Sequence, residues 1–201
     1  MPAKNSPYVS GAKLLMTSPV ISSIKSSLRG CLEVSSFLAR GFDRFDATLP
    51  TFKISFLVPL LMVPLNIPVA SYETEFQGMP LTSILIAMLY RGIVSLFFFL
   101  GGVWLLTWIL ECRHKFLKFG IVTNWLNVTG FVLMLPYLAL LVFFGFTPEE
   151  LGHLILVIVA ILCAIVAFTA RHTLKVNWPI AILISIYLIV SELLAAYMLW
   201  A

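Results

Sequence analysis

Long apolar runs dominate the chain, and short polar connectors separate them. About 20 helical residues cross a hydrocarbon core, because each residue adds about 1.5 Å to a helix. Five runs reach that length, at residues 54–72, 81–110, 121–146, 151–170 and 178–199. Backbone polar groups in lipid must be bonded within the protein, and the runs lack the alternation of barrel strands. The pattern therefore predicts five transmembrane helices.

An arm of different composition occupies residues 1–53. Its bulky apolar residues recur at steps of three to five, as in an amphipathic helix, and Ser18 followed by Pro19 is typical of a helix start. Two compatible interpretations follow: the helix lies on an anionic membrane surface, or it packs on the ends of the bundle. The candidate contacts with lipid are Lys13, Lys25, Arg29 and Arg40.

The fold class expected from these patterns is an all-α, polytopic membrane helical bundle with an N-terminal amphipathic helix. Residues 1–53 form a basic, partly helical cytoplasmic arm in this prediction, and residues 54–201 form the five-helix transmembrane bundle. The composition agrees, because 61% of the 201 residues are apolar and only 11% are charged, where soluble domains carry about 25% charged residues. A soluble globular protein and a disordered chain are both excluded.

Basic residues collect on one side of the five-span arrangement. Seven lie in the arm, three in the connector at 111–118 and two in the connector at 171–175, so twelve of the 13 Lys and Arg share one side. The loops on the other side contain Glu73, Glu75, Glu149 and Glu150 and no Lys or Arg. Lys and Arg in short loops favour the cytoplasmic side. We therefore expect a cytoplasmic N-terminus and a C-terminus outside.

The first run carries three prolines and one amide: Pro59, Pro64, Asn66 and Pro68. Each proline removes a backbone donor and disturbs the preceding helical turn. One interpretation is a kinked helix packed inside the bundle, where neighbouring helices bond the freed carbonyls. The other is a broken helix that borders a polar site, as in transporters.

Two charged residues lie inside apolar runs. Arg91 is the basic one and Glu192 the acidic one. Arg91 beside Tyr90 can extend its side chain to the outer interface. The alternative is a pair, since helical rise places the two residues about 9 Å apart in height, which tilt and a long side chain can close. Arg91 and Glu192 are therefore a candidate intramembrane polar pair.

The sequence shows no catalytic constellation. Glu150 and His153 have the spacing of a metal-binding pair, but Thr147 and Pro148 favour a capping box at a helix start instead. The three cysteines lack the spacing of a zinc site or a disulfide framework. We therefore expect a protein that is not an enzyme and that uses no cofactor, no metal and no nucleic acid partner.

Two short motifs resemble a known family. The first reads FDATLPTFKISF at residues 45–56, before a proline-containing span, and the second reads FLKFGIVTNW at residues 116–125. With the five spans, the chain over about residues 42–199 resembles the Yip-domain family, five-span proteins named for binding small Ypt/Rab GTPases, and it is most similar to bacterial, alphaproteobacterial-like members. The resemblance implies a non-enzymatic organiser or adaptor in the bacterial cytoplasmic membrane. It carries no catalytic residues.

Two hypotheses for function remain open. The first is a membrane organiser that acts through contacts with the lipid bilayer, with a membrane-protein partner or with further copies of itself. The second is a small transporter or channel that uses the proline-broken first helix and the pair of Arg91 and Glu192. A polar cavity that touches Asn66, Arg91 or Glu192 favours transport, whereas a dry bundle favours an organiser.

Overall fold

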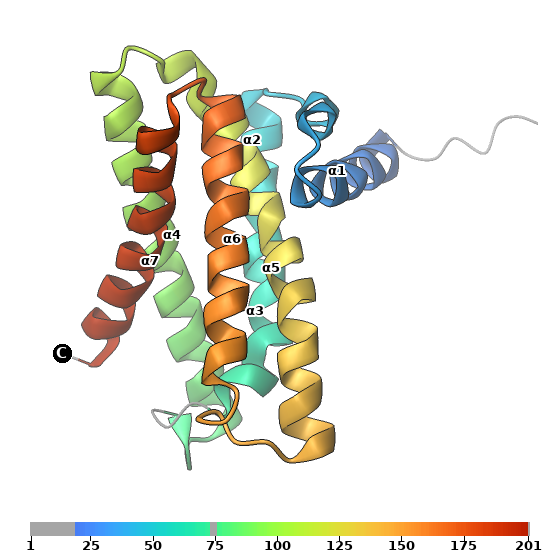
Figure 1. Ribbon diagram of the computed structural model, residues 1–201, viewed down its shortest axis with the longest axis vertical. Helices are drawn as coiled ribbons and strands as arrows, with labels where there is room; N and C mark the ends of the chain where they lie inside the picture. Colours follow the sequence, from blue (N-terminus) through green and yellow to red (C-terminus); the bar gives the residue numbers. More distant parts are fainter. Residues whose placement is uncertain (1–18, 73–75, 201) are drawn as a thin grey trace, which may run out of the picture.

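The computed structural model describes residues 19–72 and 76–200, and every regular element in these ranges is a helix. The elements in chain order are α1 (Pro19–Ser35), η1 (Ala39–Arg44), α2 (Leu49–Ser55), α3 (Leu57–Ala70), α4 (Leu81–Ile109), η3 (Arg113–Lys115), α5 (Phe116–Phe144), α6 (Gly152–Thr173) and α7 (Trp178–Trp200). The predicted all-α class is confirmed (Figure 1).

Five of these helical segments are long and apolar enough to cross a membrane. The first combines α2 and α3 over Leu49–Ala70, and the others are α4, α5 with η3, α6 and α7. The number and order of spans match the prediction from apolar runs. The protein is therefore a multi-pass membrane protein of the helical-bundle class.

The first spanning helix begins at Leu49, five residues before the apolar run at Ile54. Thr48 caps the helix by accepting a hydrogen bond from the backbone of Thr51, and Pro50 lies in the first turn. These helix-start signals precede the apolar run, so the helix begins at Leu49. A break at Phe56 then separates α2 from α3, three residues before Pro59.

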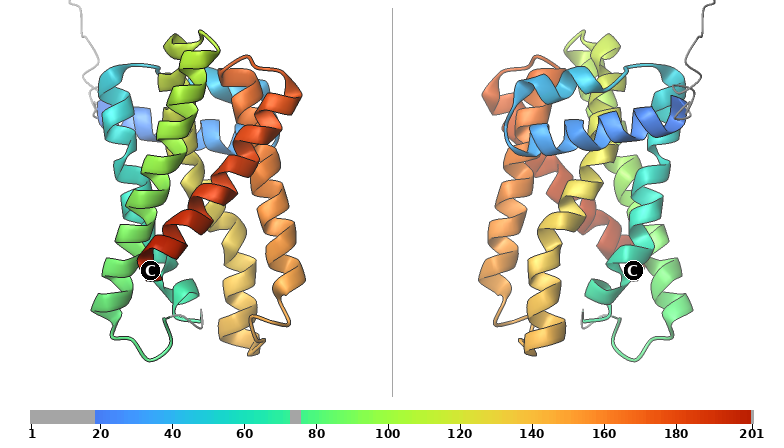
Figure 2. Two further views of the ribbon diagram at one scale, coloured as in Figure 1. Left: turned by 90° about the vertical axis from the view of Figure 1, so that its left-hand side faces the viewer. Right: turned by 90° about the vertical axis from the view of Figure 1, so that its right-hand side faces the viewer.

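The spans form a closed ring. Helix α3 contacts α4 and α5, α7 contacts α4 and α6, and α5 contacts α6. Figure 2 shows that α7 crosses the bundle obliquely, whereas the other spans run closer to the long axis. Chain neighbours are therefore not always ring neighbours, because α4 and α5 contact each other less than each of them contacts α3.

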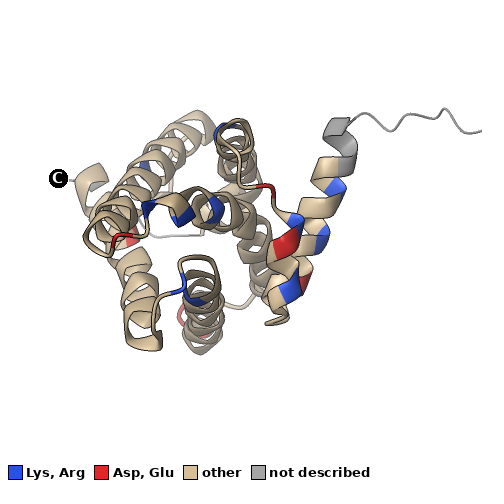
Figure 3. Ribbon diagram, turned by 90° about the horizontal axis from the view of Figure 1, so that it is seen from above, with Lys and Arg blue, Asp and Glu red and all other residues tan. Residues whose placement is uncertain are grey.

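One end of the bundle, here called the basic end, carries the connectors with Lys and Arg. Figure 3 looks down on this end. Its connector residues are Arg113, Lys115, Lys118, Arg171 and Lys175. The opposite end carries Glu149 and Glu150. The Lys and Arg of the connectors therefore lie at one end, as the sequence predicts.

Helix α1 and η1 lie outside the ring near the basic end. The right-hand view of Figure 2 shows α1 running across the spans. Gly30 and Gly41 allow α1 and η1 to approach closely, since a Cβ atom on Gly41 would lie 2.8 Å from the carbonyl oxygen of Gly30. Cys31, Val34, Phe42 and Phe45 form a buried cluster with residues of α5 and α6. This packing confirms a helix within the arm that lies against the bundle.

Candidate functional site

A cavity of about 330 Å³ lies between α3, α4, α5 and α7. Most of its wall is apolar, as expected inside a membrane bundle. Six polar or charged residues also border it: Asn66, Arg91, Ser95, Thr123, Asn127 and Glu192. Four of the five spans contribute to the wall, so the ring arrangement creates the cavity.

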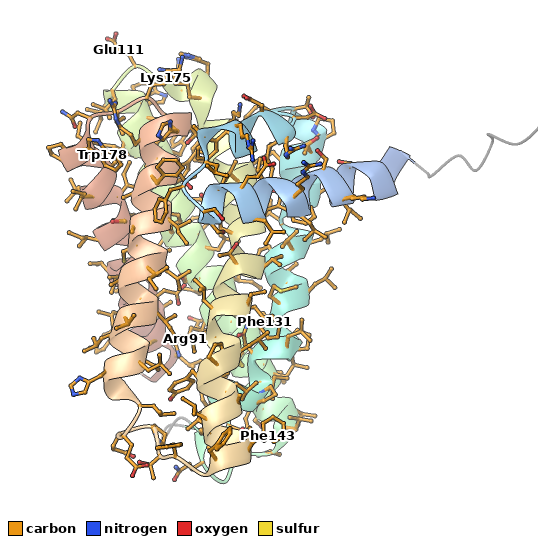
Figure 4. All side chains as sticks on the ribbon, turned by 45° about the vertical axis from the view of Figure 1, so that its right-hand side comes forward. Arg91, Glu111, Phe131, Phe143, Lys175 and Trp178 are labelled. Carbon is orange, nitrogen blue, oxygen red and sulfur yellow. The ribbon has the colours of Figure 1, made fainter. Side chains whose placement is uncertain are left out.

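Arg91 and Glu192 come together on the wall formed by α4 and α7. The Nε atom of Arg91 lies 4.0 Å from Oε2 of Glu192, and the hydroxyl of Ser95 donates a 2.5 Å hydrogen bond to Oε1 of the same carboxylate. Figure 4 shows Arg91 well below the basic end. The side chains of Arg91 and Glu192 are 30% and 47% exposed, and both residues border the cavity. The structure thus places the two candidate residues of the pair side by side.

Helix α3 contributes two of the four residues that the sequence singled out on the first span. Pro59 and Asn66 border the cavity, whereas Pro64 and Pro68 lie within α3 and outside the cavity wall. The amide of Asn66 donates a 2.9 Å hydrogen bond to the carbonyl oxygen of Met62, one turn earlier. This bond holds the amide against its own helix. Pro64 and Pro68 lie nearby in the same helix, and neither has a backbone N–H group to donate.

Helix α5 contributes two polar residues that sequence reasoning missed. Thr123 and Asn127 lie one turn apart and border the cavity. Within the described part of the chain, the buried hydroxyl of Thr123 has no hydrogen-bond partner. Their spacing of four residues was the available signal, because it places both side chains on one face of the helix.

An apolar groove of about 450 Å³ adjoins the cavity on the outer side of α3 and α4. The aromatic residues Phe52, Phe56, Phe97, Trp104 and Phe116 line it. Leu60, Ile93 and Leu96 border both the groove and the cavity. These three apolar side chains therefore lie between the polar cavity and the groove.

The candidate lipid contacts of the arm lie on α1 and η1. Lys25 and Arg29 are exposed on α1, Arg40 is exposed on η1, and Lys13 lies outside the described residues. Arg29 and Arg40 lie 3.4 and 3.8 Å from the carboxylate of Glu33. These three candidate residues therefore share one edge of the arm.

Glu33 is held chiefly by Arg44. Two hydrogen bonds of 2.7 Å, from Nε and Nη2, reach its two carboxylate oxygens. The hydrogen bonding from Arg44 lowers the pKa of Glu33, the charges of Arg44, Arg40 and Arg29 lower it further, and desolvation opposes them. The carboxylate is therefore ionised at neutral pH and fixes η1 on α1.

No group of three His, Cys, Asp or Glu side chains in the described ranges could hold a metal ion. The spacing of Glu150 and His153 has a local explanation. Glu150 accepts a hydrogen bond from the backbone of Thr147, and Thr147 accepts one from the backbone of Glu150. These are the bonds of a capping box, although the α-helix itself begins at Gly152.

Comparisons with protein-family models, curated proteins and solved structures find no match for this chain. The resemblance to the Yip-domain family therefore stays a prediction from two short motifs.

Proposed function

We propose that the protein binds a small polar solute in the cavity and carries it across the membrane. The observation that supports this proposal is that Asn66, Arg91 and Glu192, from three different helices, border one cavity. Charged and polar side chains in a membrane are costly and mark substrate paths in many proteins. Interiors are otherwise close-packed, so a bundle that only organises partners has no need for such a space.

The lining defines the class of solute. Arg91 offers only donors, Glu192 accepts when ionised, and Asn66 and Asn127 offer both. A volume of about 330 Å³ lies near the lower end of small-molecule sites. The fitting solute is therefore small and carries both hydrogen-bond donors and acceptors, with or without a charge.

The prolines of the first span weaken the helix that forms one wall of the cavity, so this wall can change conformation. Pro64 and Pro68 lie inside α3, and each removes a backbone hydrogen bond from the helix. Transporters use such interrupted helices beside their binding sites. In this proposal α3 is the mobile wall, and the other four spans, α4, α7, α6 and α5, are the more rigid frame.

Solute entry into proteoliposomes tests the proposal. Swelling is followed by stopped-flow light scattering with three probes: glycerol, glycine and guanidinium. At least one probe is expected to enter faster with the wild-type protein than with the Asn66→Leu variant, which removes the amide at nearly constant size. Leu61→Met is the control, because Leu61 is exposed on the same helix and does not border the cavity. Entry at the rate of protein-free liposomes for all three probes contradicts the proposal.

An organiser or adaptor role is the second candidate function. The observation that favours it is the arm, which presents exposed apolar and basic side chains outside the ring. Co-purification after mild crosslinking in native membranes tests it. A single membrane protein recovered with the wild type and lost after deletion of residues 1–44 is expected, and recovery of no specific partner contradicts this role.

We propose the orientation that the charges favour. The basic end faces the cytoplasm of a bacterial cell, and the C-terminus lies outside. A tag after Ala201 is then accessible to impermeant reagents in intact spheroplasts. Labelling that requires membrane disruption contradicts this orientation.

A further inference from the structure

Helix α1 exposes a row of apolar side chains, although it is not one of the candidate membrane spans. Ile24, Leu28 and Leu32 recur every four residues and are 42%, 40% and 70% exposed. A spanning helix exposes such residues to lipid, but α1 lies across the spans (Figure 2). An exposed apolar row on a helix outside the bundle indicates a contact surface.

The row faces away from η1. Successive residues of an α-helix turn by about 100°, so Gly30 and Glu33 lie about 200° and about 140° around the helix from Leu28. Both residues contact η1: Gly30 packs on Gly41, and Glu33 binds Arg44. The side of α1 that η1 covers is therefore opposite the apolar row.

The arm lies at the depth of a membrane interface. The hydroxyls of Ser35 in α1 and Thr129 in α5 are 2.9 Å apart, and Thr129 lies about 22 Å from the end of α5 at Phe144 by helical rise. The ring of Phe42 in η1 stacks on His172, about 30 Å along α6 from Gly152. A hydrocarbon core of about 30 Å measured from those helix ends therefore stops near Phe42. Ser35 lies about 8 Å inside it, within the depth of an in-plane amphipathic helix.

Basic side chains flank the apolar row. Lys25 and Arg29 follow Ile24 and Leu28 by one position each on α1, and Arg29 and Arg40 are 68% and 71% exposed. Arg44 forms both hydrogen bonds to the carboxylate of Glu33. The one negative charge of Glu33 therefore does not balance the further positive charges of Arg29 and Arg40. Residues 19–44 contain four basic and two acidic residues. The arm therefore has positive charge beside an apolar surface, and this charge can attract an anion.

We infer that α1 and η1 form a binding site for anionic phospholipid in the leaflet at the basic end. Ile24, Leu28 and Leu32 contact the acyl region, and Arg29 and Arg40 contact the lipid phosphate. An in-plane amphipathic helix with basic residues has this arrangement. Charge complementarity selects an anionic lipid over a zwitterionic one.

Spin labels test the depth of the helix. In a variant with Cys31, Cys112 and Cys163 replaced by serine, single nitroxides are placed by Leu28→Cys and by Arg29→Cys in nanodiscs. The label at 28 is expected to collide with oxygen, which concentrates in lipid, and the label at 29 with a water-soluble nickel chelate. A label at 28 exposed to nickel places the helix in water, and one shielded from both reagents places a protein there. Either result overturns the inference.

Lipid selectivity tests the headgroup site. Association of spin-labelled phosphatidylglycerol and phosphatidylcholine is compared in phosphatidylcholine nanodiscs. The double variant Arg29→Gln with Arg40→Gln is expected to lower the preference for phosphatidylglycerol by about fivefold for each arginine. The control, Lys53→Gln with Lys175→Gln, removes two exposed charges elsewhere at the basic end and keeps the preference. Equal loss in both variants, or no loss in either, overturns the inference.

Discussion

Arg44 holds the carboxylate of Glu33 through two parallel hydrogen bonds of 2.7 Å each. The pair joins η1 to α1 over a separation of eleven residues in the chain. Bidentate bonds between a guanidinium and a carboxylate are short, directional and stronger than neutral hydrogen bonds. This contact therefore fixes the shape of the arm beside the bundle.

Acid is expected to loosen the arm. The pKa of Glu33 lies below its ordinary 4.5 when folded, mainly through the hydrogen bonds from Arg44. Its contribution to stability is therefore complete above the ordinary pKa and is lost as the pH falls through the lowered folded pKa. Distances between spin labels at Lys25→Cys and Lys175→Cys should broaden below about pH 4.5. The Glu33→Gln variant should show the broad distribution already at pH 7, and an unchanged wild-type distribution down to pH 3 contradicts the prediction.

Cys31 is expected to resist thiol reagents. It is 3% exposed in the cluster between α1 and the bundle, and burial raises its pKa to about 12. Only about one thiol in ten thousand is then ionised at pH 8, and the thiolate is the reactive form. With Cys112 and Cys163 replaced by serine, maleimide labelling should be slow. Arg44→Gln, which frees η1, should accelerate it at least several-fold. Labelling of the folded wild type at the unfolded rate contradicts the prediction.

Gly102 is expected to be needed where α4 and α7 cross. A Cβ atom there would lie 2.5 Å from the ring and hydroxyl of Tyr187, whose hydroxyl donates a hydrogen bond to the carbonyl oxygen of Phe98. Gly102→Ala should lower the free energy of unfolding by about 1–3 kcal/mol, measured by thermal unfolding in detergent.

Gly101 supplies the matched control for this prediction. Nothing lies within 4 Å of a Cβ atom at Gly101, so Gly101→Ala should leave stability unchanged or raise it by up to about 1 kcal/mol through helix propensity. Adding Tyr187→Leu to Gly102→Ala should recover part of the loss. Equal stability of the two alanine variants contradicts the close packing of α4 on α7.

A buried amide links the first span to α5. Asn124 is fully buried, and its amide donates a 2.8 Å hydrogen bond to the hydroxyl of Ser55. A double-mutant cycle of Ser55→Ala and Asn124→Ala should give a coupling of about 0.6 kcal/mol, with an upper value near about 1.7 kcal/mol. Ser191 is the control, because its hydroxyl bonds to Leu188 in its own helix. A cycle of Ser191→Ala with Asn124→Ala should give no coupling, and equal coupling in both cycles contradicts the prediction.

The sequence predicted the spans well because long apolar runs have one structural solution in a membrane. Helix boundaries were harder to predict. Thr48 caps the first span six positions before the apolar run at Ile54. Thr147 and Glu150 make the predicted reciprocal bonds, yet the helix follows only from Gly152. Boundaries depend on local bonds that compete with apolarity, so they shift by several residues.

The candidate site was predicted in part. Arg91 and Glu192 stood out because a charge in an apolar run is rare, and the structure places them together. Thr123 and Asn127 did not stand out, since polar uncharged residues occur widely in membrane helices. Their position at the cavity depends on which helices are neighbours in the ring. The apolar runs of one sequence do not reveal which helices are neighbours.

Water access to the cavity tests the central proposal most directly. The water-soluble reagent MTSET is applied to proteoliposomes of two variants that lack the native cysteines, Asn66→Cys and Ser191→Cys. Asn66 borders the cavity, whereas Ser191 is fully buried next to Glu192 and does not border it. We expect Asn66→Cys to be modified in the intact protein and Ser191→Cys to be modified only after denaturation. Equal resistance of the two cysteines would show a dry bundle and would contradict a polar solute site.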